Sequence, residues 1–208
     1  MTGLIVIGGG GFAKEVIWLA QDCGYNVVGV LDDAPEMQGK TVLGIKVLGH
    51  IEKWSEFSDV EFILAIGSPR TRFKIFNKME LSGEPKFATL IHPSVSKSEF
   101  VSVGEGAIIC TGSILTTDIQ IGKHCILNLN VNVGHDCVLG EFVTIAPMVA
   151  ISGSVELNDL VEVGTGAVIR QGLSIGKGAM LGMGGVLTKN IPSNFIFIGN
   201  PAKKFKEF

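Results

Sequence analysis

The 208-residue chain is poor in charge and has no cluster of basic side chains. Only 18% of its residues are charged, against roughly 25% in an average globular protein, and the formal net charge is −3. Proteins that bind nucleic acid or an anionic membrane carry basic patches, so we expect neither partner. The chain also lacks any stretch near 18 uninterrupted apolar residues, the length that a membrane-spanning helix requires.

The four cysteines include no C-x-x-C pair, and the N-terminus has no basic segment of the kind that opens a signal peptide. We therefore expect a cytoplasmic protein. Its thiols are then reduced, and most of them fill small gaps in the core. These cysteines are Cys23, Cys110, Cys125 and Cys137.

Glycine, by contrast, is abundant, and it accompanies a repeat of six residues. Glycine accounts for 28 positions, about twice the usual ~7%, without the G-x-y triplets of collagen. A glycine follows many of the repeated aliphatic residues, and a small or β-branched side chain stands four places after most of them. The aliphatic positions are Val103, Ile109, Leu115, Ile121, Leu127, Val133, Leu139, Ile145, Ile151, Leu157, Val163, Ile169, Ile175, Leu181 and Leu187.

A period of six fits neither an α-helix nor a flat amphipathic strand. It predicts a parallel β-helix with triangular coils, in which each face takes six residues and the aliphatic side chain fills the interior. We expect five coils over 103–192, with a looser coil before them, and glycine at the corners where φ turns positive. An antiparallel sandwich is the alternative, but the unbroken phase over 90 residues disfavours it.

Residues 1–90 show no six-residue repeat and alternate between apolar runs and helical patterns. The apolar runs Leu4–Ile7, Val27–Leu31 and Phe62–Ile66 each end in a glycine or aspartate turn, and helical patterns follow the first and third. This order predicts a small parallel sheet of Rossmann-like type. We therefore expect an α/β domain at 1–90 and a β-helix domain with a C-terminal tail at 91–208.

The first turn matches a nucleotide-binding fingerprint. Gly8-x-Gly10-x-x-Ala13 follows a strand and opens a helix, and Asp32 lies nineteen residues beyond Ala13. Glycines let the backbone approach a phosphate, and the helix N-terminus supplies N–H groups. Only one βαβαβ half fits before residue 91, so a mononucleotide or nucleotide-sugar is favoured over NAD, with a turn used only for packing as the alternative.

Among the four histidines, His135 is the candidate catalyst. It stands at an outward position of the repeat and is followed at once by Asp136, whose anion favours the imidazolium that forms on proton transfer. His50, His92 and His124 are interpreted as surface or junction residues. A zinc site of the γ-carbonic anhydrase type needs a third histidine on the repeat, which is missing.

Several motifs, spread in order along the chain, resemble one family. The chain is similar to the hexapeptide-repeat acyltransferases, and within them to the sialic-acid O-acetyltransferases and the nucleotide-sugar N-acetyltransferases of the UDP-N-acetylbacillosamine type. The shared segments are Ile7-Gly-Gly-Gly-Gly-Phe-Ala, Leu31-Asp-Asp, Ala65-Ile-Gly-Ser, Ile91-His-Pro, Gly134-His-Asp-Cys-Val-Leu-Gly-Glu-Phe and Gly199-Asn-Pro-Ala.

The resemblance implies a left-handed β-helix, a homotrimer, and acetyl-CoA bound between neighbouring prisms without any metal. His135 would act as general base with Asp136 behind it, and Gly153 would supply an oxyanion N–H. The positions implied for coenzyme contacts are Thr144, Thr165, Gly182 and Met183. Those implied for the nucleotide-sugar are Gly10, Gly11, Phe12, Asp32, Asp33, Gly67 and Ser68.

We therefore expect an acetyl-CoA-dependent N-acetyltransferase acting on a UDP- or dTDP-linked 4-amino sugar in bacterial surface-glycan synthesis. Two alternatives remain open, namely O-acetylation of sialic acid or another glycan sugar, and a non-catalytic trimer that senses nucleotides. A sugar-1-phosphate nucleotidyltransferase would need a longer first domain and a basic glycine-rich loop, which the chain lacks.

Overall fold

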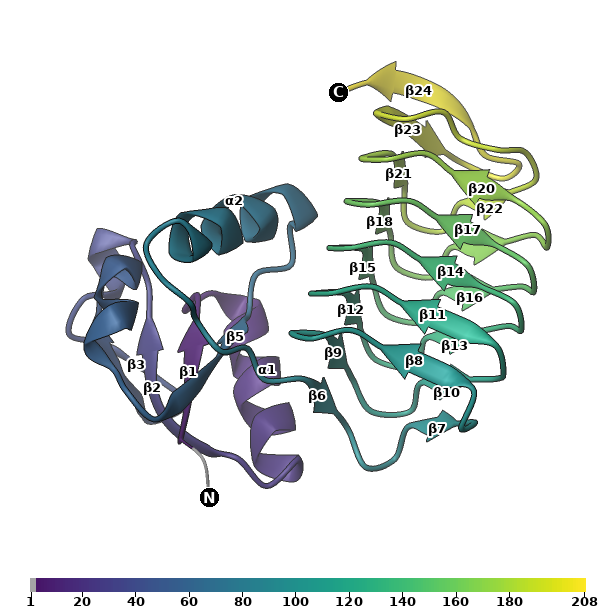
Figure 1. Cartoon of the computed structure of the whole chain (residues 1–208). Helices are drawn as coiled ribbons and strands as arrows, with labels where there is room; N and C mark the ends of the chain where they lie inside the picture. Colours follow the sequence, from purple (N-terminus) through teal and green to yellow (C-terminus); the bar gives the residue numbers. More distant parts are fainter. Residues whose placement is uncertain (1–2) are drawn as a thin grey trace.

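The computed structural model describes residues 3–208, which form two lobes (Figure 1). The N-terminal lobe is an α/β sandwich, and the C-terminal lobe is a stack of triangular coils that rises from teal to yellow in Figure 1. Within these residues, no helix is both long and apolar enough to cross a bilayer.

The N-terminal lobe is built around a sheet in the order β3-β4-β2-β1-β5, in which β1, β2, β4 and β5 run parallel. Its strands are β1 (Gly3–Ile7), β2 (Asn26–Leu31), β3 (Thr41–Val42), β4 (Ile45–Gly49) and β5 (Val60–Leu64). The β3–β4 hairpin was not predicted, since its two short strands lack a clear alternating pattern.

Two α-helices of equal length cover opposite faces of this sheet, together with two 3-10 turns. The helices are α1 (Gly11–Asp22) and α2 (Pro69–Glu80), and the turns are η1 (Pro35–Met37) and η2 (Ile51–Glu56). Ser68 caps α2 by accepting from the Thr71 N–H, and Pro69 follows at the first helical position. Helix α1 begins three residues earlier than its apolar pattern suggests, because Gly11 and Phe12 already adopt helical conformation.

The C-terminal lobe is a left-handed β-helix whose coils take 18 residues each, since paired residues such as Ile126 and Thr144 lie 18 positions apart. The first sheet contains β6 (Leu90–Ile91), β9 (Ile108–Ile109), β12 (Ile126–Leu127), β15 (Thr144–Ile145), β18 (Glu162–Val163), β21 (Met180–Leu181), β23 (Phe195–Ile198) and β24 (Lys203–Glu207). The second contains β7 (Ser96–Lys97), β10 (Ile114–Leu115), β13 (Asn132–Val133), β16 (Ala150–Ile151), β19 (Val168–Ile169) and β22 (Val186–Leu187). The third contains β8 (Val101–Val103), β11 (Ile119–Ile121), β14 (Val138–Leu139), β17 (Glu156–Leu157) and β20 (Ser174–Ile175).

The repeated aliphatic residues fill the interior of the coils, as the sequence predicts. Nearly all of them are buried in one continuous core, and the earliest coil, which begins at β6, keeps the same 18-residue spacing. Cys125 and Cys137 occupy small interior sites of this core. All four cysteines are free thiols, and burial raises the pKa of Cys125 to about 12, so it carries no reactive thiolate at neutral pH.

Glycine does occupy corners with positive φ, as predicted, at six positions from Gly106 to Gly184, but the glycines directly after the aliphatic residues are not among them. Positive φ falls three places after every repeated aliphatic residue except Leu187, and not one place after it; at eight of these corners the residue is not glycine, as at Asp136 (φ 58°) and Met148 (φ 60°). The glycines one place after the aliphatic residues serve close backbone packing. A Cβ on Gly104 would stand 2.7 Å from the backbone nitrogen of Lys123 in the next coil.

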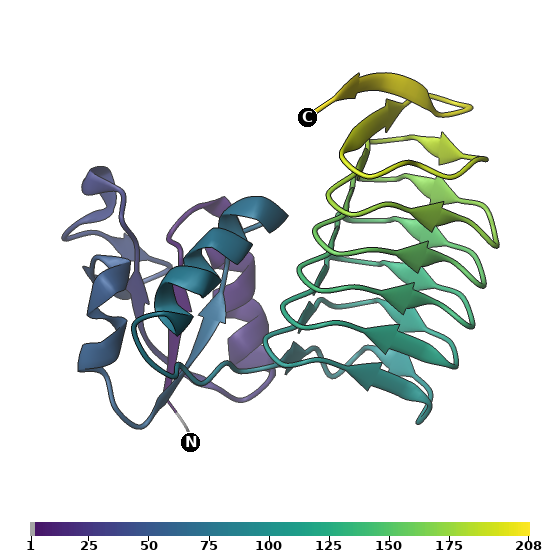
Figure 2. The ribbon, with the colours of Figure 1, turned by 45° about the horizontal axis from the view of Figure 1, so that its top comes forward.

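The first sheet of the β-helix carries the N-terminal lobe on its outer face (Figures 1 and 2). Ile108 and Ile126 point outward from the coils, yet they are buried in the same cluster as residues of α1 and β1. The outer face of the first sheet is therefore apolar at these positions because it packs against the N-terminal lobe and not against water.

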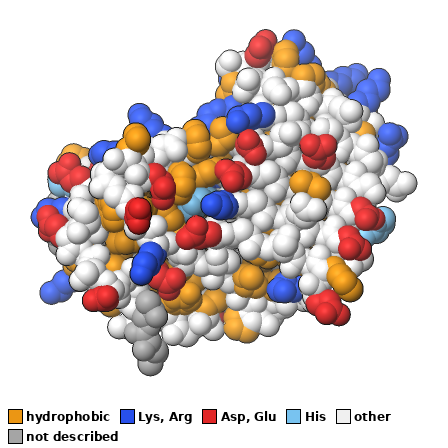
Figure 3. Space-filling model, viewed as in Figure 1, with side chains coloured by type: hydrophobic (Ala, Val, Ile, Leu, Met, Phe, Trp, Pro, Cys, Tyr) orange, Lys and Arg blue, Asp and Glu red, His pale blue; other side chains and the backbone are white. Residues whose placement is uncertain are grey.

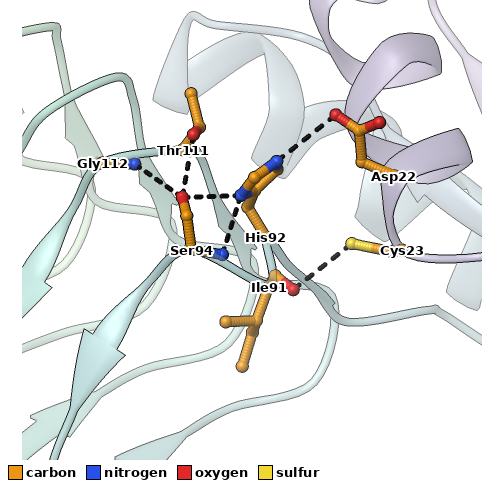
Figure 4. A network of polar contacts seen from close by, with 7 residues as sticks. All are labelled: Asp22, Cys23, Ile91, His92, Ser94, Thr111 and Gly112. Carbon is orange, nitrogen blue, oxygen red and sulfur yellow. Dashed lines mark hydrogen bonds and ion pairs between the residues drawn. The ribbon is translucent and has the colours of Figure 1, made fainter.

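A polar network fixes the point where the chain passes from one lobe to the other (Figure 4). His92 Nε2 lies 3.3 Å from Asp22 at the end of α1, and its Nδ1 lies 2.7 Å from the hydroxyl of Ser94. That hydroxyl also contacts Thr111 and accepts from the Gly112 N–H. His92 therefore lies at the lobe junction.

Candidate active site

His135 and Asp136 form an exposed pair at the corner between the second and third sheets, hereafter the 2–3 corner. Asp136 Oδ2 lies 2.6 Å from His135 Nδ1, and both side chains are more than half exposed. When Nδ1 bears the proton that faces this carboxylate, Nε2 presents a lone pair to the solvent. The pair thus has the arrangement of a general base held by an anion.

Gly153 lies over the imidazole, one coil further along the β-helix. A Cβ built on Gly153 would stand 2.6 Å from both Cε1 and Nε2 of His135, whereas its φ lies outside the left-handed region. Glycine is required here because the ring occupies the space of a side chain. Within residues 3–208 the Gly153 N–H donates to no acceptor, so it is available to a ligand beside His135.

Three of the predicted coenzyme residues lie together at another corner, between the first and second sheets (the 1–2 corner). Thr165 follows β18, and Gly182 and Met183 follow β21 one coil above. The Gly184 N–H donates to the Thr165 carbonyl, and Met183 is 79% exposed.

A pocket of about 390 Å³ opens in the N-terminal lobe at the carboxyl ends of β1, β2 and β5. The first turns of α1 and α2 both border it, so the positive ends of two helix dipoles face the same space. Backbone N–H groups for a ligand come from α1, because α2 begins with Pro69 and its Thr71 N–H is capped by Ser68. Six of the seven residues predicted for the nucleotide-sugar line it. They are Gly10, Gly11, Phe12, Asp32, Asp33 and Gly67.

The two aspartates of this pocket organise its walls. The carboxylate of Asp32 accepts from the N–H groups of Gly9 and Ala34, so it holds the glycine turn against the end of β2. Asp33 accepts from the Ile51 N–H at the start of η2. Ser68 is absent from the pocket lining, because its hydroxyl caps α2.

Thr144 does not lie with the other predicted coenzyme residues, and that prediction is corrected. Thr144 belongs to β15, and its side chain points toward the N-terminal lobe. Its hydroxyl donates to the Gly67 carbonyl at 2.8 Å and accepts from Arg72 at 2.9 Å. The hydroxyl therefore both donates and accepts between the lobes.

Sequence reasoning missed Arg72, which the structure places at the centre of the lobe interface. Its side chain is 1% exposed, and it donates to carbonyl oxygens of both lobes. Burial lowers the pKa of its guanidinium to about 10. An isolated arginine in a helical pattern gives no signal of burial, because the periodicity of α2 does not show what lies against each face.

His124, interpreted as a surface or junction residue, is a fully buried junction residue. Its ring stacks on Phe142 at 4.9 Å between centroids and contacts Phe76 and Phe87. Neither ring nitrogen has a hydrogen-bond partner within the described residues. Burial first, and then the charge of Arg72, lowers the pKa of His124 to about 3, so the ring is neutral.

The pocket of the N-terminal lobe and the His135–Asp136 pair lie on opposite sides of the first sheet of the β-helix. The N-terminal lobe packs on the first sheet, and the 2–3 corner is the corner of the triangle that faces away from that sheet (Figure 1). Hydrophobic side chains gather on the N-terminal lobe along the line where the lobes meet (Figure 3). In residues 3–208, no group of three or more His, Cys, Asp or Glu side chains is placed to hold a metal ion.

Comparison with known proteins agrees with this arrangement. Residues 3–79 match the family model described as the PglD N-terminal domain. The whole chain superposes on a crystal structure of perosamine N-acetyltransferase from Caulobacter crescentus, in which a histidine is replaced by asparagine. That structure contains CoA and GDP-perosamine. The TM-score is 0.91 and the identity 32%, over 100% of this chain and 98% of the other.

The chain belongs to the hexapeptide-repeat sugar N-acetyltransferase family.

A second member is the acetyltransferase domain of PglB from Neisseria gonorrhoeae, with a TM-score of 0.92 and 32% identity over 99% of this chain and 100% of that one. An uncharacterised protein, L142, of Acanthamoeba polyphaga mimivirus is 28% identical over 57% of this chain, and the match spans 23% of that longer protein. Family membership confirms the predicted fold class and the resemblance on which the sequence interpretation depends.

Proposed function

We propose that this family member transfers the acetyl group of acetyl-CoA to the amine of a nucleotide-linked amino sugar in bacterial surface-glycan synthesis. The observation that carries the proposal is the exposed His135–Asp136 pair beneath the free N–H of Gly153. The perosamine N-acetyltransferase with 32% identity, crystallised with CoA and GDP-perosamine, supports this class of substrates.

The chemistry needs one base and one oxyanion donor. Nε2 of His135 accepts a proton from the sugar amine as its nitrogen attacks the thioester carbon, and the Asp136 carboxylate stabilises the imidazolium. The negative charge that develops on the thioester oxygen accepts from the Gly153 N–H. When the carbon–sulfur bond breaks, the imidazolium returns the proton to the CoA thiolate, and the amide and free CoA leave.

The pocket of the N-terminal lobe suits the nucleotide part of the acceptor. A diphosphate placed against Gly10 and Gly11 would meet the N-terminal ends of α1 and α2, where both helix dipoles favour an anion and the first turn of α1 adds backbone N–H groups. Asp33 has one carboxylate oxygen beyond its bond to Ile51, so it offers an acceptor to a base or ribose.

The separation of pocket and base indicates that a second copy of the chain completes the site. Transfer requires the amine and His135 to approach within bonding distance, and one chain holds them on opposite sides. We therefore include a homotrimer in the proposal, with acetyl-CoA between the 2–3 corner of one subunit and the 1–2 corner of its neighbour. The outer face of the second sheet, between these corners, exposes Ile114 and Val168.

A thiol-release assay with acetyl-CoA tests the proposal. GDP-, UDP- and dTDP-linked 4-amino sugars are compared as acceptors with free sialic acid. We expect turnover with at least one nucleotide-linked amino sugar, and a loss of roughly 10²–10⁴-fold in kcat in His135→Ala with its oligomeric state intact. Turnover with sialic acid alone, or unchanged turnover in His135→Ala, would overturn it.

A further inference from the structure

Arg72 makes all of its side-chain hydrogen bonds within the described residues to neutral oxygen atoms, and these come from both lobes. Nη1 donates to the carbonyls of Ile66 and Gly67 in the N-terminal lobe, at 2.6 and 3.0 Å. Nε donates to the His124 carbonyl and Nη2 to the Phe142 carbonyl of the β-helix, at 3.0 and 2.9 Å. The guanidinium is a rigid fork, so these four bonds fix the two lobes in a single relative position.

Thr144 closes a ring of hydrogen bonds around the same point. Arg72 Nη2 donates to the Thr144 hydroxyl, which donates to the Gly67 carbonyl, and Gly67 also accepts from Arg72 Nη1. The Gly67 carbonyl is thus held by two donors from two lobes. The segment Ile66–Ser68 has no regular secondary structure to fix it, because it lies between β5 and α2.

This segment forms part of the nucleotide pocket. Ile66 and Gly67 line it opposite the glycine turn, and Thr71, one residue before Arg72, lines it as well. Any shift of the segment relative to the β-helix would therefore move one wall of the pocket. Within the described residues no carboxylate lies at ion-pair distance from this guanidinium, and the charge of Glu162 acts on it only through space. Burying the guanidinium costs free energy, which an apolar side chain at this interface would avoid.

We propose that Arg72 is a positioning residue for the nucleotide-linked acceptor, acting together with Thr144. By holding Ile66–Ser68 against the β-helix, it sets where the pocket presents the acceptor amine relative to the base on the neighbouring subunit. This inference rests on the proposed function.

Arg70 provides a matched control on the same helix. Its guanidinium also reaches the β-helix, donating to the Gly178 carbonyl and lying 3.7 Å over the Phe208 ring. Arg70 does not contact the pocket segment. If Arg72 only joined the lobes, substitutions of Arg70 and Arg72 would have the same effect on the kinetic constants.

The decisive variant is Thr144→Val, which removes two hydrogen bonds without opening a large cavity. Arg72→Lys is the second variant, and Arg70→Met the control. We expect Thr144→Val to raise KM for the nucleotide-linked amino sugar by roughly five- to ten-fold, because a lost hydrogen bond of this kind is worth about that factor. KM for acetyl-CoA should change less than two-fold. Arg70→Met should lower Tm and leave both KM values unchanged.

Equal changes in both KM values, or wild-type kinetics in both Thr144→Val and Arg72→Lys, would overturn the inference. Calorimetric titration with GDP and UDP compares the nucleotide affinity of the wild type and Thr144→Val without requiring turnover. If the wild type binds one of these nucleotides and Thr144→Val weakens that binding, but no acetyl transfer is found, the proposed function fails, while the part of Arg72 and Thr144 in holding the nucleotide pocket stands. If the nucleotide binds both proteins equally, the positioning role fails.

Discussion

Gly153 lies directly over the imidazole of His135, one coil away, at a distance that leaves no room for a side chain. A Cβ on Gly153 would stand 2.6 Å from Nε2, the nitrogen that faces away from Asp136. The two residues are 18 positions apart, which is one full coil of the β-helix. The stacking of coils therefore places the proposed base next to the proposed oxyanion donor.

Replacing Gly153 by alanine should impair the reaction without unfolding the protein. The added methyl group must displace the ring or occupy the space where the thioester approaches, and a misplacement of about 1 Å costs roughly 100-fold in rate. We expect kcat to fall by about that factor. Ser152→Ala, at the same corner, is the control. Wild-type turnover in Gly153→Ala would show that the imidazole does not act at this position.

Asp136→Asn tests whether the carboxylate supports the base. Asp136 has φ 58°, a conformation that asparagine tolerates, so the backbone should be preserved. The amide cannot stabilise an imidazolium and can hold the ring in the wrong tautomer. We expect kcat to fall between about 10- and 1000-fold with KM for acetyl-CoA unchanged. If steady-state kinetics show no loss, His135 works without its neighbour.

Asp32→Asn should weaken binding of the nucleotide-linked sugar through the shape of the pocket. Gly9 and Ala34 donate to different carboxylate oxygens of Asp32, and asparagine keeps only one of these as an acceptor, so either the glycine turn or the segment after β2 loses its bond to this side chain. We expect KM for the sugar to rise by roughly ten-fold, while KM for acetyl-CoA stays constant. Parallel rises in both values would indicate a general loss of structure.

His124 should make the folded state sensitive to acid. Its pKa is about 3 in the folded protein and near 6.5 when unfolded, so the unfolded chain binds the extra proton between these values. Stability is therefore full above about pH 6.5 and falls as the pH drops toward 3, by up to ~1.4 kcal/mol per unit.

Urea unfolding at pH 7 and 4.5, at fixed protein concentration, measures this effect. His124→Phe keeps an aromatic ring beside Phe142 and carries no titrating group. We expect the wild type to lose on the order of 2 kcal/mol more than the variant between the two pH values. Identical losses would mean that the ring becomes solvated before the protein unfolds.

The position directly after a repeated aliphatic residue and the position three places after it should respond in opposite ways to substitution. A Cβ on Gly122 would stand 2.6 Å from the carbonyl carbon of Gly140, so Gly122→Ala should cost about 3 kcal/mol or more. Met148 is 67% exposed and adopts φ 60°, so Met148→Asn should stabilise by about 0.5–1 kcal/mol. Chemical denaturation of both variants measures these changes. If Gly122 were needed for its backbone freedom and not for close packing, Gly122→Ala would cost far less than this.

The six-residue period predicted the β-helix because it reports which side chains point inward, and Leu127, Ile145 and Val163 are all interior. The period does not report backbone conformation. It therefore could not tell the glycines that take positive φ, three places after an aliphatic residue, from those directly after it, which do not. The glycine turn and Asp32 were likewise readable, because a strand, a turn and a helix lie within a short stretch of sequence.

By itself, the sequence determined the coil, its interior and the lone outward His135–Asp136 pair, since each depends on local spacing. Only the tertiary structure decided which of three equivalent outer faces is covered. Once the N-terminal lobe packs on the first sheet, Ile126 becomes core, Thr144 turns from a ligand candidate into a link between lobes, and Arg72 and His124 are buried. The physical reason is that a repeat gives every coil the same pattern, whereas burial of its outer face depends on what another part of the chain brings against it.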